Sequence, residues 1–321
     1  MTTNEVLFVY APGFQFSQEE ITAFQTEFPN LHFTEADAET VTDDQLEKAE
    51  IICGYPHPES VRKAVNMRWL QLSSIGVDKH IHKELYVQPE AVLTNCHGNN
   101  GLPISDHVLS MILLLSRNLH YYRDQQNARI WAKMVPTKDL FNSSVLVIGL
   151  GSVGSNTARK CNALGMKTMA VDIQDEKKPE YVDILKKTEL LDELLPQADF
   201  VVLTAPSTPE TYHIMNSERF QKMKRDAYLI NVSRGALVDT NAFIEALQNG
   251  IIAGAAVDVF DEEPLPVESP LWGIKNVFLT PHVAGKSPSA HIRHFNTFHD
   301  NLIRYLKGEP LNNVIDFSRH F

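Results

Sequence analysis

An arginine, a glutamate and a histidine each follow a run of residues that the sequence predicts to be a strand. They are Arg234 in 231–235, Glu263 in 258–264 and His282 in 280–282. An arginine guanidinium offers a planar fork of donors that matches a carboxylate. A histidine can pass a proton to a carbonyl oxygen, and a carboxylate beside it fixes its tautomer and stabilises the imidazolium. Beside a nicotinamide, these groups are the parts needed to reduce a 2-oxo acid to a 2-hydroxy acid.

Each of the three residues also has an ordinary structural interpretation. A single arginine such as Arg234 is more often a helix-terminus or surface partner. Glu263 ends the acidic run 261–263, and such runs are usually solvated. One of 13 histidines at a strand end is more often structural than catalytic. We favour the functional interpretation because all three follow strands of one dinucleotide-binding fold.

A glycine-rich stretch predicts that fold. Residues 145–148 are apolar, and Gly149, Gly151 and Gly154 follow at the spacing G-x-G-x-x-G, ahead of an expected helix at 155–164. Gly149 permits a tight turn, Gly151 lets backbone amides approach a pyrophosphate, and Gly154 lets the helix lie close to the strand. The helix N-terminus adds unpaired amides and partial positive charge for the phosphates. The alternative is a glycine-rich turn in another α/β fold.

An acidic residue completes the fingerprint. The expected strand 166–171 runs into Asp172, whose carboxylate can accept hydrogen bonds from both hydroxyls of an adenosine ribose. The same carboxylate would repel a 2′-phosphate, and Ile173 rather than an arginine follows it. Lys177 and Lys178 lie close enough in sequence to reach back to such a phosphate. Asp172 and Ile173 nevertheless predict a preference for NAD over NADP.

Composition limits the class of protein. A chain of 321 residues favours two domains, and a net charge of -11 argues against a nucleic-acid partner. The three cysteines show no metal or redox spacing, so we expect no metal and a reducing compartment. The N-terminus lacks the features of a signal peptide, and the most apolar helix, 108–115, is too short to cross a membrane. We therefore expect a cytoplasmic protein with no membrane partner.

The first hundred residues alternate apolar runs with helical patterns, which predicts a parallel sheet covered by helices. The expected strands are 6–10, 31–33, 51–54, 69–72 and 91–94, and the expected helices are 17–28, 42–49 and 58–65. Ser17 and Glu20 resemble a capping box at the first helix. The loop that contains Ser74, Ile75 and Gly76 follows a strand, so it is either a substrate loop or an ordinary turn.

The second half of the chain predicts a six-stranded doubly wound sheet. Its expected strands are 145–148, 166–171, 199–204, 227–232, 251–257 and 277–280, and its later expected helices are 186–195, 217–223 and 239–248. We expect the last helix, 288–306, to return to the first domain. The predicted domains are therefore residues 1–99 with 287–321, and residues 100–286. The fold class is α/β, with two doubly wound parallel-sheet domains, of which the larger is a Rossmann dinucleotide-binding domain.

An expected helix at 105–119 is apolar almost all round, so we expect it to be buried on more than one side. Either a domain-spanning helix or a subunit interface would explain this pattern. A more polar helix is expected to continue over 121–131.

The chain as a whole resembles the D-isomer-specific 2-hydroxyacid dehydrogenases, most strongly over 145–285. The resemblance rests on the glycine loop with Asp172, on the segments around Arg234, Glu263 and His282, and on Ser269-Pro270-Leu271-Trp272. It implies that Arg234 binds the substrate carboxylate, that His282 is the acid–base, and that Glu263 is its partner. The family's long helix usually starts after Glu-His, whereas this chain has Asp106-His107. Residues 97–102 match no sub-family pattern, so the sequence does not predict which 2-oxo acid is the substrate.

The resemblance also implies contacts with the cofactor, the substrate and a second subunit. Asp258 would contact the nicotinamide carboxamide, and the amides of Ser74, Ile75 and Gly76 would hold the carboxylate. The resemblance implies a homodimer whose subunits associate through the segment equivalent to residues 100–140. Further residues implied to line the cofactor are Ser152, Val153, Ala205, Pro206, Thr211, Val232 and Ser233.

Two alternative functions stay open on the sequence. An NAD(H)-sensing, corepressor-like protein of the same fold would bind the cofactor tightly with negligible turnover. Arg234, Glu263 and His282 argue against it. A formate- or phosphonate-type dehydrogenase is a second enzyme alternative, and for formate the resemblance would lead us to expect an amide in place of the Glu263 carboxylate.

Overall fold

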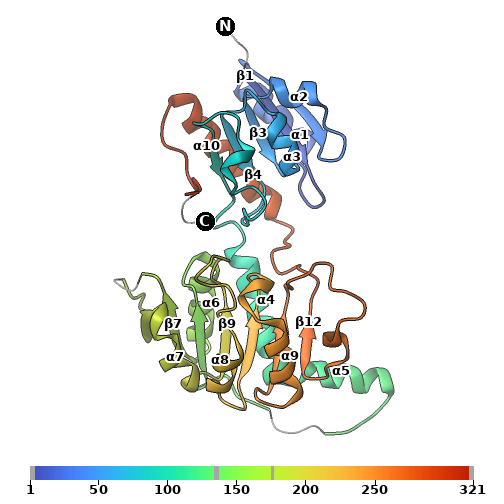
Figure 1. Cartoon of the computed structure of the whole chain (residues 1–321), viewed down its shortest axis with the longest axis vertical. Helices are drawn as coiled ribbons and strands as arrows, with labels where there is room; N and C mark the ends of the chain where they lie inside the picture. The colour runs from blue at the N-terminus through green and yellow to red at the C-terminus, as the bar shows by residue number, and fades with distance from the viewer. Residues whose placement is uncertain (1–3, 134–136, 175–176, 318–321) are drawn as a thin grey trace. The chain divides into compact units, whose positions relative to one another are not determined.

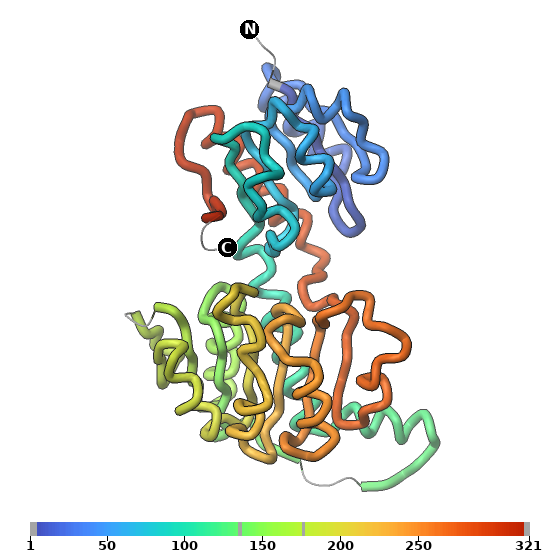
Figure 2. The backbone as a smooth tube through the Cα atoms, in the orientation of Figure 1, coloured from blue at the N-terminus to red at the C-terminus, as the bar shows by residue number. Residues whose placement is uncertain are grey.

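The computed structural model describes residues 4–133, 137–174 and 177–317. The chain divides into two compact units. The first unit contains Met1–Asn100 and Ser287–Phe321, and the second contains Gly101–Lys286. Figures 1 and 2 show both units, and each is described by itself below.

The first unit is built on a five-stranded parallel sheet with the order β2-β1-β3-β4-β5. Its strands are β1 (Asn4–Tyr10), β2 (Leu31–Asp37), β3 (Ile51–Gly54), β4 (Trp69–Leu72) and β5 (Val92–Thr94). Its helices are α1 (Gln18–Glu27), α2 (Asp43–Lys48), α3 (Pro58–Lys63) and α10 (Ala290–Lys307), with a 3-10 turn at Lys83–Leu85. All five strands expected from the sequence are present, although β2 extends four residues beyond the expected end.

Alternating side chains of β1 explain the two layers of helices in this unit. Leu7 and Val9 pack into a core that includes residues of α2 and α3. Phe8 packs on the opposite face with α1 and α10, where its ring centroid lies 5.8 Å from Phe24 and 5.6 Å from Phe298. The C-terminal helix α10 is therefore part of the core of the first unit.

Helices α1 and α2 begin where the sequence provides side-chain caps. Ser17 and Glu20 form a capping box at α1, as expected. Thr42 and Gln45 form a second one at α2. Each box satisfies backbone amides that the first turn of a helix leaves unpaired.

The second unit is built on a seven-stranded parallel sheet with the order β12-β11-β10-β9-β6-β7-β8. Its strands are β6 (Ser144–Ile148), β7 (Lys167–Asp172), β8 (Ile184–Lys187), β9 (Phe200–Leu203), β10 (Tyr228–Asn231), β11 (Gly254–Val257) and β12 (Val277–Leu279). Its helices are α4 (Gly101–Ser116), α5 (Leu119–Ala128), α6 (Ser152–Ala163), α7 (Leu191–Leu194), α8 (Ser217–Lys222) and α9 (Thr240–Gln248). Short 3-10 turns occupy Thr188–Leu190, Leu195–Gln197, Gly235–Leu237 and Pro270–Gly273.

Helices cover both faces of this sheet, as the alternation of β6 requires. Leu146 and Ile148 pack with residues of α7, α8 and α9. Val145 and Val147 pack on the other face with residues of α4 and α6. The strand order reverses between β6 and β9, and in doubly wound sheets ligands bind beyond the carboxyl ends of the strands at such a point. The two-domain α/β fold predicted from the sequence is confirmed.

The count of six strands was wrong, and the helix expected over 186–195 begins two residues later than expected. Residues Ile184–Lys187 instead form β8, which pairs with β7 at the edge of the sheet. This strand has four residues, two of them lysines, and none is buried, so it lacks the apolar run that marks the interior strands. The rest of the expected helix, 188–195, is helical, as the four-residue α7 flanked by 3-10 turns.

The apolar helix expected at 105–119 also differs. Helix α4 begins at Gly101 and ends at Ser116, because Asn118 adopts a left-handed conformation with φ of 55°. Within the chain alone, Val108, Met111 and Ile112 are buried, whereas Leu113 is 40% exposed and Leu102 is 51% exposed. The helix therefore buries one side within its own unit and leaves apolar side chains on another.

Candidate functional site

Glu263 and His282 form the central contact of the candidate site. His282 Nδ1 lies 2.7 Å from Glu263 Oε2. The other oxygen, Oε1, accepts a hydrogen bond of 2.9 Å from the amide of Phe260. A carboxylate can only accept, so it requires the proton of a neutral His282 on Nδ1 and leaves Nε2 for another partner. Both side chains remain partly exposed, His282 at 51% and Glu263 at 34%.

The backbone of His282 is fixed by the strand beside it. The His282 amide donates to the carbonyl of Asp258 at 2.8 Å, and His282 adopts a φ of 49°. A non-glycine residue in this region is uncommon and is held by its surroundings. The loop after β12 thus carries His282 in one defined orientation.

Asp258 holds the same loop through its side chain. It is 1% exposed, and its carboxylate accepts the amides of Val283 at 2.9 Å and Ala284 at 2.8 Å, and also the hydroxyl of Thr280. A buried carboxylate with several donors is well compensated. The structure gives Asp258 this role in holding the loop, and its predicted contact with a nicotinamide carboxamide stays a prediction.

Arg234 lies in a loop organised by the side chain of Asn231. Asn231 Oδ1 accepts the amide of Ser233 at 3.0 Å, and its Nδ2 donates to the carbonyl of Arg234 at 2.9 Å. One guanidinium nitrogen of Arg234, Nη1, donates to the carbonyl of Ser233 at 2.7 Å. Asn231 is 1% exposed, so this turn is built into the end of β10.

The loops that carry Arg234 and Glu263 touch at Gly235. A Cβ atom at Gly235 would lie 2.0 Å from the carbonyl carbon of Phe260 and 2.1 Å from the amide nitrogen of Asp261. Any larger residue would force the two loops apart. The structure therefore brings together the loops of the three residues that the sequence singled out, at the ends of β10, β11 and β12.

The glycine loop fits the phosphates of a dinucleotide. A Cβ at Gly151 would meet no atom within 4 Å, whereas one at Gly154 would lie 2.0 Å from the carbonyl oxygen of Gly149. Helix α6 begins directly after Gly151, without a side-chain cap. Within the described residues, the amides of Gly151, Ser152 and Val153 donate to no protein acceptor. Such amides at a helix N-terminus suit a phosphate.

Asp172 fixes this loop at the end of β7. Its Oδ2 accepts the amide of Leu150 at 2.6 Å, and its Oδ1 accepts the amide of Gln174 at 3.0 Å. Each oxygen has a second acceptor direction for a ligand hydroxyl. Lys178 Nζ donates to the carbonyl of Val182 at 2.6 Å.

Further predicted cofactor residues lie in the loops that follow β9 and β10. Gly149 approaches Ala205 so closely that a Cβ would lie 2.7 Å from the Ala205 Cα. The hydroxyl of Ser233 donates to the carbonyl of Ala205, and that of Thr211 to the carbonyl of Pro206 at 2.7 Å. Val232 is 8% exposed. These contacts order the loop ends, and contact of these residues with a cofactor stays a prediction.

The predicted substrate loop lies in the first unit, after β4. Ser74 Oγ donates to the carbonyl of Gly76 at 2.7 Å, and Asn95 Nδ2 donates to the carbonyl of Ile75 at 2.7 Å. The carbonyl of Ser74 accepts the amide of Cys96 at 2.9 Å. Within the described part of the chain, the amides of Ser74, Ile75 and Gly76 donate to no protein group. The loop is thus fixed through its carbonyls, which leaves its amides to a ligand.

Sequence reasoning missed the residues that hold these loops. Asn231 and Thr280 were named only as parts of the segments 231–235 and 280–282, and Asn95 was not singled out. Each directly follows or ends a strand and carries a side chain able to bond to its own loop, which was the available signal. Their partners are known only once the strands are aligned.

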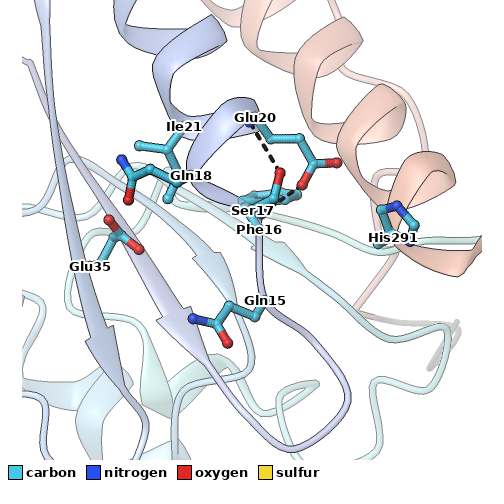
Figure 3. A pocket seen from close by; sticks show the side chains of 8 residues that line it. All are labelled: Gln15, Phe16, Ser17, Gln18, Glu20, Ile21, Glu35 and His291. Atoms are coloured by element: carbon cyan, nitrogen blue, oxygen red, sulfur yellow. Dashed lines mark hydrogen bonds between the residues drawn. The ribbon is translucent and has the colours of Figure 1, made fainter.

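A separate hollow lies at the start of α1, in the first unit. Its volume is about 500 Å³, and its lining includes Ser17, Glu20, Glu35 and His291. Figure 3 shows Ser17 and Glu20 occupied with each other in the capping box. The hollow contains none of the residues that the sequence predicted for the site.

The described residues contain neither a cluster of metal ligands nor a membrane-spanning helix. No group of three or more histidine, cysteine, aspartate or glutamate side chains among them is arranged to hold a metal ion. None of the helices within the described ranges is long and apolar enough to span a membrane.

The fold and the site define a class: parallel-sheet α/β proteins with a dinucleotide site at the strand ends. Residues 109–284 match the family described as D-isomer specific 2-hydroxyacid dehydrogenase, NAD binding domain. The chain belongs to this family. The resemblance noted from the sequence is therefore confirmed, and the family supports an NAD(P)-dependent 2-hydroxyacid dehydrogenase activity.

Individual relatives agree over most of the chain. A glyoxylate reductase from Thermofilum pendens is 35% identical over 78% of this chain and 75% of its own length. The crystal structure of a D-isomer specific 2-hydroxyacid dehydrogenase family protein from Aeromonas salmonicida is 30% identical, with a TM-score of 0.86 over 98% of this chain and 99% of that one. An NADPH-dependent glyoxylate/hydroxypyruvate reductase from Sinorhizobium meliloti, in complex with NADP and sulfate, is 26% identical, with a TM-score of 0.83 over 99% of this chain and 100% of that one.

Proposed function

We propose that this protein reduces a 2-oxo acid to the D-2-hydroxy acid with NADH, and catalyses the reverse oxidation with NAD. The observation that carries the proposal is the 2.7 Å contact between His282 Nδ1 and Glu263 Oε2 beside the Arg234 loop. This pair lies at the carboxyl ends of strands in a sheet whose glycine loop fits a dinucleotide. The reduced nicotinamide, when bound, supplies the hydride.

His282 is the proposed proton donor to the carbonyl oxygen of the substrate. As a carbonyl carbon is reduced, negative charge develops on its oxygen, and a proton delivered from Nε2 neutralises it. Glu263 stabilises the imidazolium before transfer and holds the ring after it. In the oxidation direction, neutral His282 takes the hydroxyl proton through the same nitrogen.

Arg234 is the proposed carboxylate binder. Its guanidinium can present two parallel N–H donors to the planar carboxylate of a 2-oxo acid. In the first unit, the amides of Ser74, Ile75 and Gly76 supply further donors suited to an anion. The two-point contact with Arg234 orients the carbonyl next to the carboxylate, which lowers the entropic part of the barrier.

The proposed cofactor is NAD rather than NADP. Asp172 places a carboxylate where the adenosine ribose is expected, and like charge disfavours a 2′-phosphate there. The Sinorhizobium meliloti relative is NADPH-dependent, so family membership alone does not decide between the two cofactors.

We also propose a homodimer formed through residues of about 100–140, in the cytoplasm. The support for the dimer is a set of apolar side chains exposed on α4, α5 and the segment after them: Leu102, Leu113, Leu119, Tyr122, Ile130 and Trp131. Trp131 is 98% exposed. Residues 134–136 of this segment lie outside the described residues. The free cysteines Cys53, Cys96 and Cys161 are consistent with a reducing compartment.

A screen of 2-oxo acids with NADH tests the proposal. Glyoxylate, hydroxypyruvate, pyruvate and phenylpyruvate span small to bulky substrates, and loss of the reduced-nicotinamide absorbance measures turnover. We expect turnover with at least one, with a D-configured product wherever the product is chiral. Tight NADH binding without turnover across the series would instead indicate a protein that senses NAD(H).

A further inference from the structure

A chain of side-chain contacts connects α4 to the loop that carries His282. His107 Nε2 lies 3.2 Å from Thr280 Oγ1, and Thr280 Oγ1 lies 2.5 Å from Asp258 Oδ1. His107 Nε2 also lies 3.9 Å from the same carboxylate oxygen. These residues come from three separate parts of the second unit: helix α4, the end of β11 and the end of β12.

The direction of each hydrogen bond follows from the chemistry of the groups. An ionised carboxylate only accepts, so the single hydroxyl proton of Thr280 goes to Asp258. Thr280 Oγ1 can then only accept from His107, which requires a proton on His107 Nε2. This tautomer is the opposite of the one that Glu263 requires of His282.

Asp258 and Thr280, at the far end of this chain of contacts, hold the backbone on both sides of His282. Asp258 accepts the amides of Val283 and Ala284 through its side chain, and its carbonyl accepts the amide of His282 itself. Thr280 precedes His282 by two residues. His107 therefore contacts a unit whose shape sets the position of the His282 backbone.

The turn of α4 that carries His107 is held by burial on one side and by polar contacts with α6 on the other. The next residue, Val108, is fully buried in the core beneath the sheet. One residue before His107, Asp106 accepts Lys160 Nζ of α6 at 2.7 Å, and Ser105 Oγ lies 2.6 Å from the same nitrogen. A side chain on this turn has little freedom to move relative to the sheet.

We propose that His107 is a positioning residue for His282. It acts through Thr280 and Asp258 and holds the loop at 280–284 in the geometry from which His282 delivers its proton. The proposal rests on the proposed function, because the effect is expressed as the rate of 2-oxo acid reduction. A loop displaced by a fraction of an ångström lowers that rate with little change in cofactor affinity.

Steady-state kinetics of a set of variants provides the first test. His107→Leu and Thr280→Val each remove one contact, and each should lower kcat by roughly tenfold or more, with KM for NADH within about threefold. The kcat of the double variant should be at most about threefold lower than that of the slower single variant, because both changes break the same chain of contacts. His107→Gln retains an N–H donor of similar reach and should recover kcat to within about threefold of wild type.

His299→Leu is a matched control. The side chain of His299 is 24% exposed, as is that of His107, and it is also hydrogen-bonded, to Glu27 at 2.9 Å, but it lies on α10 in the first unit. We expect it to change kcat by less than about twofold. The proposal is overturned if His107→Leu behaves like this control, if the two single effects multiply in the double variant, or if His107→Gln is as slow as His107→Leu.

A measurement without turnover separates this proposal from the proposed function. In the NAD-bound protein labelled with ¹⁵N histidine, the imidazole signals that disappear in His107→Gln belong to His107. The proposal predicts a protonated Nε2 for this ring, and an Nδ1–H tautomer would contradict it whatever the activity. If no 2-oxo acid is reduced but the tautomer is as predicted, the proposed function fails and the contact chain stands.

Discussion

Glu263 binds His282 with one carboxylate oxygen and its own loop with the other. Oε2 lies 2.7 Å from His282 Nδ1, while Oε1 accepts the amide of Phe260 at 2.9 Å. The carboxylate therefore cannot rotate away from the imidazole without losing a backbone hydrogen bond. This arrangement presents Nε2 of His282 outward from a fixed ring, as a proton donor requires.

Glu263→Gln should separate the charge of this carboxylate from its geometry. Glutamine can still accept from one side but no longer stabilises an imidazolium. Reduction of the 2-oxo acid takes its proton from an imidazolium, so the variant should have a lower kcat for reduction by roughly tenfold or more, with KM for NADH within about threefold of wild type because the hydrogen bond to the ring can be kept. Equal kcat values for wild type and variant, measured by initial rates with the same 2-oxo acid, would mean that the charge of Glu263 does not assist His282.

Arg234→Ala should remove the main carboxylate contact. The loss of a charge-assisted bidentate pair should remove transition-state stabilisation on the order of several kcal/mol. This loss should lower kcat/KM on the order of a hundredfold or more. Arg234→Lys keeps the charge without the planar fork and should mainly raise KM. If Arg234→Ala left kcat/KM within about threefold of wild type, another group would have to bind the carboxylate.

Asp172 should decide the choice of cofactor. We expect kcat/KM to be at least about tenfold higher with NADH than with NADPH, since a carboxylate next to a 2′-phosphate costs at least this much. Asp172→Ser should narrow the ratio, and it should also raise KM for NADH because the Leu150 amide loses its acceptor. Initial rates with both cofactors measure this. Equal or better use of NADPH by wild type would refute it.

The first unit should lose stability in mild acid because of His294. Burial, followed by the nearby charges of Arg293 and His291, lowers the pKa of His294 to about 4 from 6.5. The unfolded chain binds a proton below pH 6.5 that the folded chain excludes until about pH 4. His294 therefore does not reduce the free energy of unfolding above pH 6.5. As the pH drops from 6.5 toward 4, this free energy falls by up to about 3 kcal/mol.

Urea unfolding at several pH values checks this prediction. Trp69 is fully buried in the first unit, whereas Trp131 and Trp272 are exposed, so tryptophan fluorescence reports mainly on the core around α10. His294→Leu should have a smaller loss of midpoint between pH 6.5 and 4 than wild type. Parallel losses in the two proteins would show that other groups cause the acid sensitivity.

Much of the fold could be predicted because its interior strands are buried on both faces. Core strands such as β9 are unbroken apolar runs, and the glycine spacing after β6 identifies the cofactor loop. The same local patterns identified Glu263 and His282 as neighbours, because each follows a strand and parallel strands end at one edge.

What the sequence did not predict depends on contacts between distant residues. Strand β8 is short and half-exposed, so its pairing with β7 rather than its own pattern determines it. The support that His107 gives to Thr280 joins residues 173 positions apart, and neither residue type indicates the other. The break at Asn118 required a left-handed residue that helical periodicity does not reveal.

The most direct test of the account is the kinetic effect of His282→Ala on the best 2-oxo acid found in the screen. If His282 delivers the proton, kcat should fall by roughly two to four orders of magnitude, the usual contribution of general acid–base catalysis. The dissociation constant for NADH should stay within about threefold of wild type, since no cofactor-binding group is removed. A variant that kept kcat within about fivefold of wild type would contradict the central claim that His282 is the acid–base of a 2-oxo acid reductase.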